Sequence, residues 1–281
     1  MKIFERSGDL QVFLDARRSS NKKVALVPTM GGLHEGHLRL VEKAQSLADV
    51  VVVSVFVNPT QFAKDEDFDS YPKTFSEDKL LLEGQSVDAL FIPSKNEIYP
   101  NGTFSNYDVG EMGGLLCGAS RPEHFNGVAQ VVNRLFDIVN PNYSVFGEKD
   151  YQQLLIIKSL VENNNLNVLI GSVSTKREID GLAMSTRNKY LGNKERQKAP
   201  LFYQQLSNAK AAIEQGDSIE FIMEKTLSEL SVYFEVEYLE ILNANNLTQI
   251  ATNTSEIIII SAIRLGETRL IDNIVFRRPN V

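Results

Sequence analysis

Cysteine, tryptophan and histidine are scarce in this chain of 281 residues, which has one cysteine, no tryptophan and three histidines. The single cysteine, Cys117, has no partner within the chain, and this excludes a disulfide-stapled domain. The first ten residues, MKIFERSGDL, lack the apolar core of a secretion signal. These absences together predict a cytoplasmic protein.

Long apolar runs are also missing. The longest one covers residues 50–53 and continues over 55–57, far short of the roughly 20 residues that a membrane-spanning helix needs. The net charge of -7 makes the surface as a whole a poor partner for nucleic acid. We therefore expect neither a membrane nor a nucleic acid as partner, and any anion site must be built from local groups.

Short apolar runs alternate with amphipathic stretches in the first part of the chain. This alternation is typical of an α/β fold, and it predicts a Rossmann-like doubly wound parallel sheet. Residues 99–127 have many glycines and no clear period, so we expect a long loop or hairpin region there. The expected strands are 24–28, 51–59, 87–92, 143–146 and 166–170, and the expected helices are 8–20, 35–48, 63–86, 127–139 and 150–163.

The pattern changes after Gly192. Two helices near 199–213 and 217–231 are followed by strands at 235–242, 256–263 and 268–276. The sequence thus predicts a first domain over residues 1–175 and a smaller C-terminal α+β domain over residues 176–281.

A strand, a glycine-rich turn and two histidines follow one another in the stretch KVALVPTMGGLHEGHLRL. The strand at 24–28 leads into Gly31 and Gly32, and His34 and His37 lie where a helix should begin. A buried strand that feeds a helix N-terminus is a common place for a nucleotide phosphate. Two imidazoles and the amide groups of the helix start could hold a triphosphate, and helix capping or core packing of the histidines is the alternative.

Three familiar binding motifs do not fit this stretch. HEGH is one residue short of the zinc-binding pattern H-E-x-x-H, and nothing nearby completes a ligand set. MGGLHEG does not fit G-x-G-x-x-G, and the P-loop pattern G-x-x-x-x-G-K-[ST] does not occur in the chain. A nucleotide would therefore need a different cradle.

Further polar segments follow the expected strands. Asn58 and Gln61 could bind a small polar substrate, or they could be turn residues. In FGEKDYQQL, Lys149 could contact a phosphate and Gln153 could face the same binding cleft. The alternative is that this charged segment is a solvated turn. Asp150 could act there as a helix cap or as a metal or ribose ligand.

Two more loops and an acidic helix start are candidates. In DGLAMSTRN, Arg187 could close over leaving phosphates, or the loop could cap a helix. Arg121 and His124 could line a cleft or anchor a hairpin. Glu77 and Asp78 could hold a magnesium ion, although acidic helix starts are also favoured by the helix dipole.

Five segments in this order, PTMGGLHEGH, FVNPTQF, HFNGVAQVV, FGEKDYQQL and DGLAMSTRN, closely resemble the pantothenate synthetases, the family of pantoate–β-alanine ligases. The similarity covers most of residues 24–191. It implies a nucleotidyl transferase fold with HIGH-type and KMSKS-type motifs, a first domain that binds ATP and pantoate, a C-terminal lid domain and a homodimer.

The resemblance also implies a reaction in two steps. Pantoate attacks the α-phosphate of ATP, with Mg2+ present, to give pantoyl adenylate and pyrophosphate, and β-alanine then displaces AMP. Another adenylyl or cytidylyl transferase of the same fold, or a noncatalytic nucleotide-binding module, is the alternative.

The resemblance further implies roles for individual residues. Catalysis falls to His37, His34, Lys149 and Arg187, with His37 as a proton donor. Gln61 and Gln153, with Asn58 and Arg121, bind the substrate acid. Lys176 stands where the family usually has valine, and Thr186 replaces a frequent serine. The implied ATP contacts are Met30, Gly31, Gly32, Leu33, His34, Glu35, Gly36, His37, Gly147, Glu148, Lys149, Asp150, Lys176, Met184, Ser185, Thr186 and Arg187.

Overall fold

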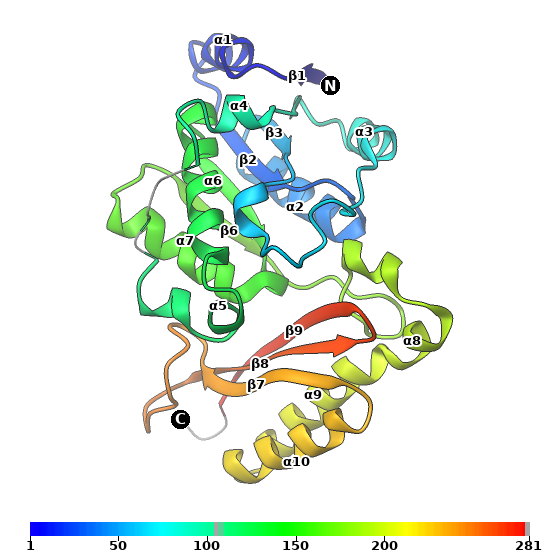
Figure 1. Cartoon of the computed structure of the whole chain (residues 1–281). Coiled ribbons are helices and arrows are strands. Elements are labelled where there is room, and N and C mark those ends of the chain that lie inside the picture. The colour runs from blue at the N-terminus through cyan, green and yellow to red at the C-terminus, as the bar shows by residue number, and fades with distance from the viewer. Residues whose placement is uncertain (104–106, 108, 279–281) are drawn as a thin grey trace. The chain divides into compact units, whose positions relative to one another are not determined.

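A computed structural model describes residues 1–103, 107 and 109–278 of the chain (Figure 1). The chain divides into two compact units. The first unit consists of Met1–Glu148 and Gln153–Ser174, and the second consists of Lys149–Gln152 and Thr175–Val281. The short segment Lys149–Gln152 thus groups with the C-terminal part of the chain, which the sequence pattern did not indicate.

The first unit is built on a six-stranded sheet in the order β1-β4-β3-β2-β5-β6, and every neighbouring pair is parallel. This confirms the predicted α/β fold. The strand β1 was not predicted, because three residues are too few to show a pattern. The strands are β1 (Lys2–Phe4), β2 (Val24–Thr29), β3 (Val50–Val55), β4 (Ala89–Phe91), β5 (Tyr143–Gly147) and β6 (Leu169–Val173).

Helices cover both faces of this sheet. Successive side chains of a strand point to opposite faces, so Val24 and Leu26 of β2 pack in one core with α1, α6 and α7, whereas Ala25 and Val27 pack in another with α2 and α3. Burial on both faces explains why the strands are almost continuously apolar. The helices are α1 (Ser7–Arg18), α2 (Glu35–Leu47), α3 (Phe75–Gly84), α4 (Lys95–Ile98), α5 (Cys117–Ser120), α6 (His124–Val139) and α7 (Tyr151–Asn163).

The helix expected over 63–86 is much shorter in the structure, since α3 begins only at Phe75. Residues 62–74 form turns instead. The ring of Phe62 packs against Phe68 and Tyr71, with centroid distances of 5.4 and 5.9 Å. These aromatic contacts, together with Pro72, favour a folded-back segment over a continuous helix.

The loop expected over 99–127 contains the 3-10 helix η2 (Glu111–Gly114), the helix α5 and the first turn of α6. Part of this prediction, residues 104–106 and 108, lies outside the described residues. Every helix in the described ranges is too short or too polar to cross a membrane.

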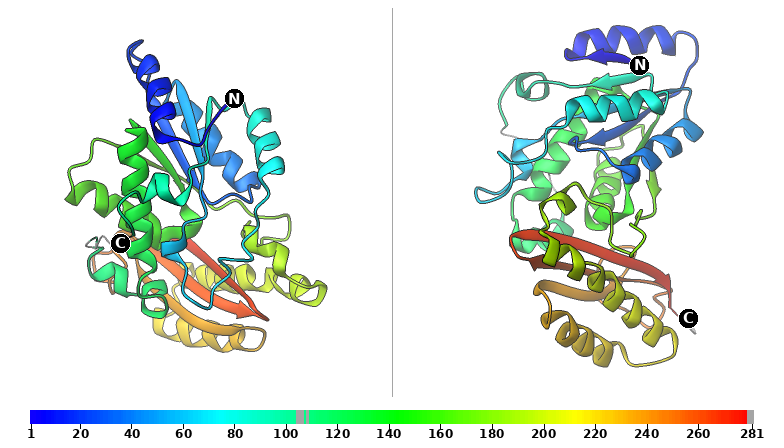
Figure 2. Two further views of the ribbon diagram at one scale, coloured as in Figure 1. Left: turned by 45° about the horizontal axis from the view of Figure 1, so that its top comes forward. Right: turned by 90° about the vertical axis from the view of Figure 1, so that its right-hand side faces the viewer.

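The second unit contains the predicted α+β module. Its strands β7 (Glu235–Asn243), β8 (Glu256–Leu265) and β9 (Thr268–Arg277) form an antiparallel sheet in chain order. Helices α9 (Pro200–Glu214) and α10 (Ile219–Ser231) lie side by side along one face of this sheet (Figure 2). A short 3-10 helix, η4 (Thr186–Tyr190), and α8 (Asn193–Lys198) precede them.

Candidate active site

Three neighbouring strands of the first unit, β3, β2 and β5, end at the same edge of the sheet because they are parallel. From β2 the sheet grows towards β3 on one side and towards β5 on the other. Ligands of doubly wound sheets bind outside the carboxyl ends of the strands at such a reversal of strand order. Several of the predicted site residues lie at or just after these strand ends, namely residues 30–37, Asn58, Gln61, Gly147 and Glu148.

The turn after β2 is built on two glycines and a buried carboxylate. Gly31 and Gly32 have φ angles of 83° and 63°, a region that other residues rarely adopt. Asp78 is 1% exposed and accepts hydrogen bonds from the amide of Gly32 (3.0 Å) and from the amide of Leu33 (2.8 Å). Asp78, one of the two expected metal ligands, therefore anchors the turn.

Metal binding by Asp78 and Glu77 stays a prediction. The Oδ1 atom of Asp78 also accepts a hydrogen bond from Thr74 Oγ1 (3.1 Å), so both carboxylate oxygens are engaged. Glu77 is exposed, and consecutive residues of a helix do not face each other. Within the described residues, no group of three or more His, Cys, Asp or Glu side chains is placed to hold a metal ion.

The two histidines lie at the start of α2, as predicted. His34 is the N-cap, and its Nδ1 accepts a hydrogen bond from the amide of Gly36 (3.1 Å). His37 Nδ1 accepts one from the amide of His34 (3.3 Å), and the ring centroids are 4.1 Å apart. Since both Nδ1 atoms are acceptors, each neutral ring carries its proton on Nε2. The histidines thus cap the helix and also have Nε2–H donors.

Gln61, in the 3-10 helix η1 (Pro59–Gln61) after β3, is held at both ends of its side-chain amide. Its Oε1 accepts a hydrogen bond from Asn58 Nδ2 (3.0 Å), and its Nε2 donates to Met30 Sδ (3.2 Å). The structure therefore joins the segments after β2 and β3 through Gln61 and Met30.

Asn58 is 1% exposed and has a supporting role. Its Nδ2 also donates to the carbonyl of Gly127 (3.1 Å), and its Oδ1 accepts from the hydroxyl of Tyr99 (2.7 Å). Asn58 thus supports the side chain of Gln61, and the contact with substrate that the resemblance implied for Asn58 stays a prediction. Burial raises the pKa of Tyr99 to about 12, so its hydroxyl remains protonated and able to donate.

Gly127 and Tyr99 are site residues that the sequence prediction missed. A Cβ atom on Gly127 would lie 2.2 Å from the carbonyl oxygen of Thr60, so only glycine lets α6 approach η1 this closely. A glycine within an amphipathic helix was the signal that could have identified it. Nothing in the spacing of Tyr99 pointed to this site.

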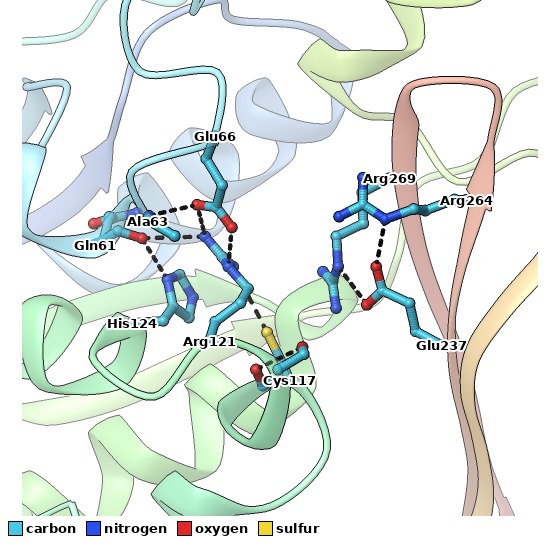
Figure 3. A network of polar contacts seen from close by, with 10 residues as sticks. Gln61, Ala63, Glu66, Cys117, Arg121, His124, Glu237, Arg264 and Arg269 are labelled. Carbon is cyan, nitrogen blue, oxygen red and sulfur yellow. Dashed lines mark hydrogen bonds and ion pairs between the residues drawn. The ribbon is translucent and has the colours of Figure 1, made fainter.

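The main chain of Gln61 is held by a second network (Figure 3). Its carbonyl accepts hydrogen bonds from His124 Nδ1 (2.8 Å) and from Arg121 Nη2 (3.1 Å). Arg121 Nη2 also donates to Glu66 Oε2 (2.6 Å), and Arg121 Nε pairs with Glu66 Oε1. Arg121 and His124 thus anchor the main chain of Gln61, and the cleft-lining role left open for them stays a prediction. Binding of the substrate acid by Arg121 stays a prediction.

The Glu66–Arg121 pair should make stability depend on pH. Burial alone would raise the pKa of Glu66, but the hydrogen bond and charge of Arg121 outweigh it, and the pKa lies below its ordinary value of 4.5. The ionised carboxylate therefore stabilises the fold above pH 4.5, and this contribution is lost as the pH falls through the lower folded-state value. We expect Glu66→Gln to lose about 1–3 kcal/mol at pH 7. In urea unfolding the difference from the unsubstituted protein should shrink between pH 4.5 and pH 3, and an equal difference at pH 3 would contradict this account.

The segment after β5 is divided between the units. Glu148 belongs to the first unit, where its Oε1 accepts a hydrogen bond from Ser172 Oγ (2.7 Å) on β6. Gln153 is half-buried in the first turn of α7, and its binding of the substrate acid stays a prediction. Lys149 and Asp150 belong to the second unit.

The remaining predicted residues, Lys176 and 184–187, form one local structure in the second unit. The amide of Met184 donates to the carbonyl of Lys176 (2.9 Å). Ser185 is the N-cap of η4, and its Oγ accepts a hydrogen bond from the amide of Arg187 (3.3 Å). Thr186 is buried, with 5% of its surface exposed. The helix-capping role left open for this loop is confirmed.

A helix N-terminus and polar side chains at the carboxyl edge of an open parallel sheet lie where such α/β folds bind ligands, including nucleotide phosphates. The family model of pantoate–β-alanine ligase matches residues 2–275. The chain therefore belongs to the pantoate–β-alanine ligase family, and it is an enzyme of the ligase class.

Individual relatives agree over almost the whole chain. A pantothenate synthetase of Ruthia magnifica subsp. Calyptogena magnifica is 51% identical over 99% of this chain and 100% of its own length. The crystal structure of pantothenate synthetase from Thermus thermophilus has a TM-score of 0.92 at 40% identity and covers 98% of this chain and 99% of its own. Pantoate-β-alanine ligase from Francisella tularensis, complexed with β-γ ATP and β-alanine, has a TM-score of 0.79 at 36% identity, with 98% and 97% coverage.

Proposed function

We propose that the protein condenses pantoate with β-alanine to give pantothenate, with ATP converted to AMP and pyrophosphate through a pantoyl adenylate. One observation supports this most directly: Gln61 Nε2 donates to Met30 Sδ. This bond joins the amide that we assign to the acid with the turn that we assign to the phosphates. Met30 follows β2 and Gln61 follows the neighbouring strand β3, at the carboxyl edge of the sheet.

The chemistry explains why such a site needs donors and cations more than a strong nucleophile. A carboxylate is a poor acceptor for an amine, because the amine would have to expel oxide. When the pantoate carboxylate attacks the α-phosphorus, the bond to pyrophosphate breaks and the acid gains AMP as a leaving group. The amine of β-alanine then attacks the acyl carbon, AMP leaves and the amine loses a proton.

Each group has a task in this sequence. Gln61 and Gln153 orient the pantoate, and the Nε2–H groups of His34 and His37 donate to phosphate oxygens, where His37 also serves as proton donor. Lys149 and Arg187 add positive charge that stabilises the leaving pyrophosphate. The remaining groups of residues 30–36, 147–150, 176 and 184–186 contact ATP, and Arg121 reaches the acid. None of these tasks requires Cys117.

Mg2+ is the ion that we propose to accompany ATP. Mg2+ keeps several waters and binds the phosphates of the substrate, so it needs at most one or two protein carboxylates, and the exposed Glu77 would be one of them. Use of ATP supports a cytoplasmic location, and the family supports a homodimer. A different adenylyl or cytidylyl transferase would use another acid or nucleotide, so dependence on pantoate separates the two functions.

The test is isotope exchange between ATP and pyrophosphate. We expect exchange with Mg2+ and pantoate in the absence of β-alanine, and no exchange without pantoate. The variant Gln61→Ala should raise the KM for pantoate about tenfold, because one hydrogen bond to a charged acid is lost, and leave the KM for ATP almost unchanged. Exchange that is independent of pantoate, or absent with it, would refute the proposed route.

A further inference from the structure

Two adjacent polar residues lie buried in the last strand of the second unit. Asp272 is 2% exposed and Asn273 is 6% exposed, in the middle of β9. Buried polar side chains lower stability unless they have partners. The partners of this pair are segments that carry proposed ATP contacts, and no sequence motif had pointed to either residue.

Asp272 binds Arg177 with both of its oxygens. Arg177 Nη1 donates to Oδ2 (2.6 Å) and Nη2 donates to Oδ1 (2.9 Å), and Nη2 also donates to the carbonyl of Asn273 (3.3 Å). This fork-to-fork arrangement fixes the orientation of the guanidinium as well as its position. The guanidinium lies over the ring of Tyr203 in α9, 3.6 Å from the centroid.

Arg177 also holds the loop that ends at Arg187. Its Nη1 donates to the carbonyl of Gly181 (3.2 Å), and Arg177 forms an antiparallel bridge with Ala183. Gly181 has a φ of 94°, and a Cβ atom there would lie 2.7 Å from the ring of Tyr203. Residues 176–184 are therefore a closed turn fastened to β9, and 185–187 follow directly.

Asn273 contacts the segment that contains Lys149, the second proposed cation for the phosphates. Its Nδ2 donates to the main-chain carbonyl of Lys149 (2.9 Å). Burial raises the pKa of Asp272, while the hydrogen bonds of Arg177 and the charges of Arg177 and Lys149 oppose that rise. The charge of Lys149 thus acts on the same carboxylate that holds Arg177.

We infer that Asn273 and Asp272 are positioning residues for ATP, because together they fasten Lys149 and the 176–187 loop to one strand. This inference rests on the proposed function, in which both segments bind phosphates. A triphosphate is bound tightly only when its cations are held at matching separations, so the positions of these two segments on β9 should set the affinity for ATP.

The variant Asn273→Ala tests the inference. It removes the donor to Lys149 without placing a new charge in the strand. We expect the Kd for ATP, measured by equilibrium titration, and the KM for ATP in the exchange reaction to rise about five- to tenfold, which corresponds to one hydrogen bond. The KM for pantoate should stay the same.

Ser261→Ala is the matched control. Ser261 is fully buried on β8 opposite Asp272, and its Oγ donates to the main-chain carbonyl of Tyr238 (2.8 Å), so the variant also loses one side-chain to main-chain bond of the same sheet. It should lower the unfolding temperature by a similar amount and leave ATP binding unchanged. If Asn273→Ala raised the Kd for ATP no more than Ser261→Ala does, the inference would be wrong.

A double-mutant cycle with Lys149→Ala shows whether Asn273 acts through Lys149. In the double variant we expect the Kd for ATP to rise by less than the product of the two single-variant factors, because Asn273 acts by positioning Lys149. A rise equal to that product would mean that the two residues act independently, and it would overturn the inference. ATP titration needs no acid, so an unsubstituted protein that binds ATP but shows no exchange with pantoate would refute the proposed function and leave Asn273 testable. Failure to bind ATP at all would refute both.

Discussion

The variant His34→Asn is expected to form pantoyl adenylate roughly 100- to 1,000-fold more slowly than the unsubstituted enzyme, because a donor to the developing phosphate charge is lost. The fold should be unaffected. His34 caps α2 by accepting the amide of Gly36, and the side-chain oxygen of asparagine is among the best N-cap acceptors. Single-turnover formation of the adenylate, followed by chemical quench, measures the rate, and thermal unfolding measures the stability.

The variant His34→Ala is the matched control, because it removes both the donor and the cap. Its adenylation should be as slow as that of His34→Asn, and its stability should fall by about 1 kcal/mol more. If His34→Asn kept the full rate while His34→Ala lost it, His34 would act only as a helix cap. The two variants therefore separate the capping and catalytic roles that one side chain combines.

The variant Asp78→Ala should lower the free energy of unfolding by roughly 2–6 kcal/mol. Two buried amides, those of Gly32 and Leu33, would lose their acceptor, and each unsatisfied buried donor costs about 1–3 kcal/mol. The turn after β2 should loosen at the same time and weaken ATP binding. Urea unfolding and ATP titration measure the two effects.

Glu77→Ala is the control for this prediction. Glu77 is exposed on the same turn of α3, so its loss should change stability by no more than about 0.5 kcal/mol. If Asp78 were a metal ligand, its substitution would change the Mg2+ requirement and would leave stability unchanged. If Asp78→Asn left the unfolding midpoint unchanged and only raised the Mg2+ concentration needed for exchange, the structural role assigned to Asp78 would be wrong.

Local chemistry explains most of what could be predicted. The strand β2 is apolar because it is buried on both faces, and His34 is recognisable as a helix start because it follows two glycines. The same logic predicted Gln61 at the end of a strand. In each case the signal lies within a few residues of the feature that it predicts.

The predicted start of the helix at residue 63 was wrong, and the structural role of Asp78 was not foreseen. The helix expected from residue 63 begins only at Phe75, because Phe62 packs against Phe68 and Tyr71. The structural role of Asp78 requires the amide of Leu33, 45 residues away. An acidic helix start looks the same in a sequence whether its carboxylate faces water, a metal or a buried turn.

The sequence by itself determined most of the strands and helices, the glycine turn with its two histidines, and the family, because each of these is encoded by neighbouring residues. Only the tertiary structure decided which side chains support the site. It placed Asn58 and Gly127 beneath Gln61, and it fastened Lys149 and the loop of Arg177 to β9. Those contacts join residues up to 124 positions apart, and a buried polar group takes whichever partner folding brings to it.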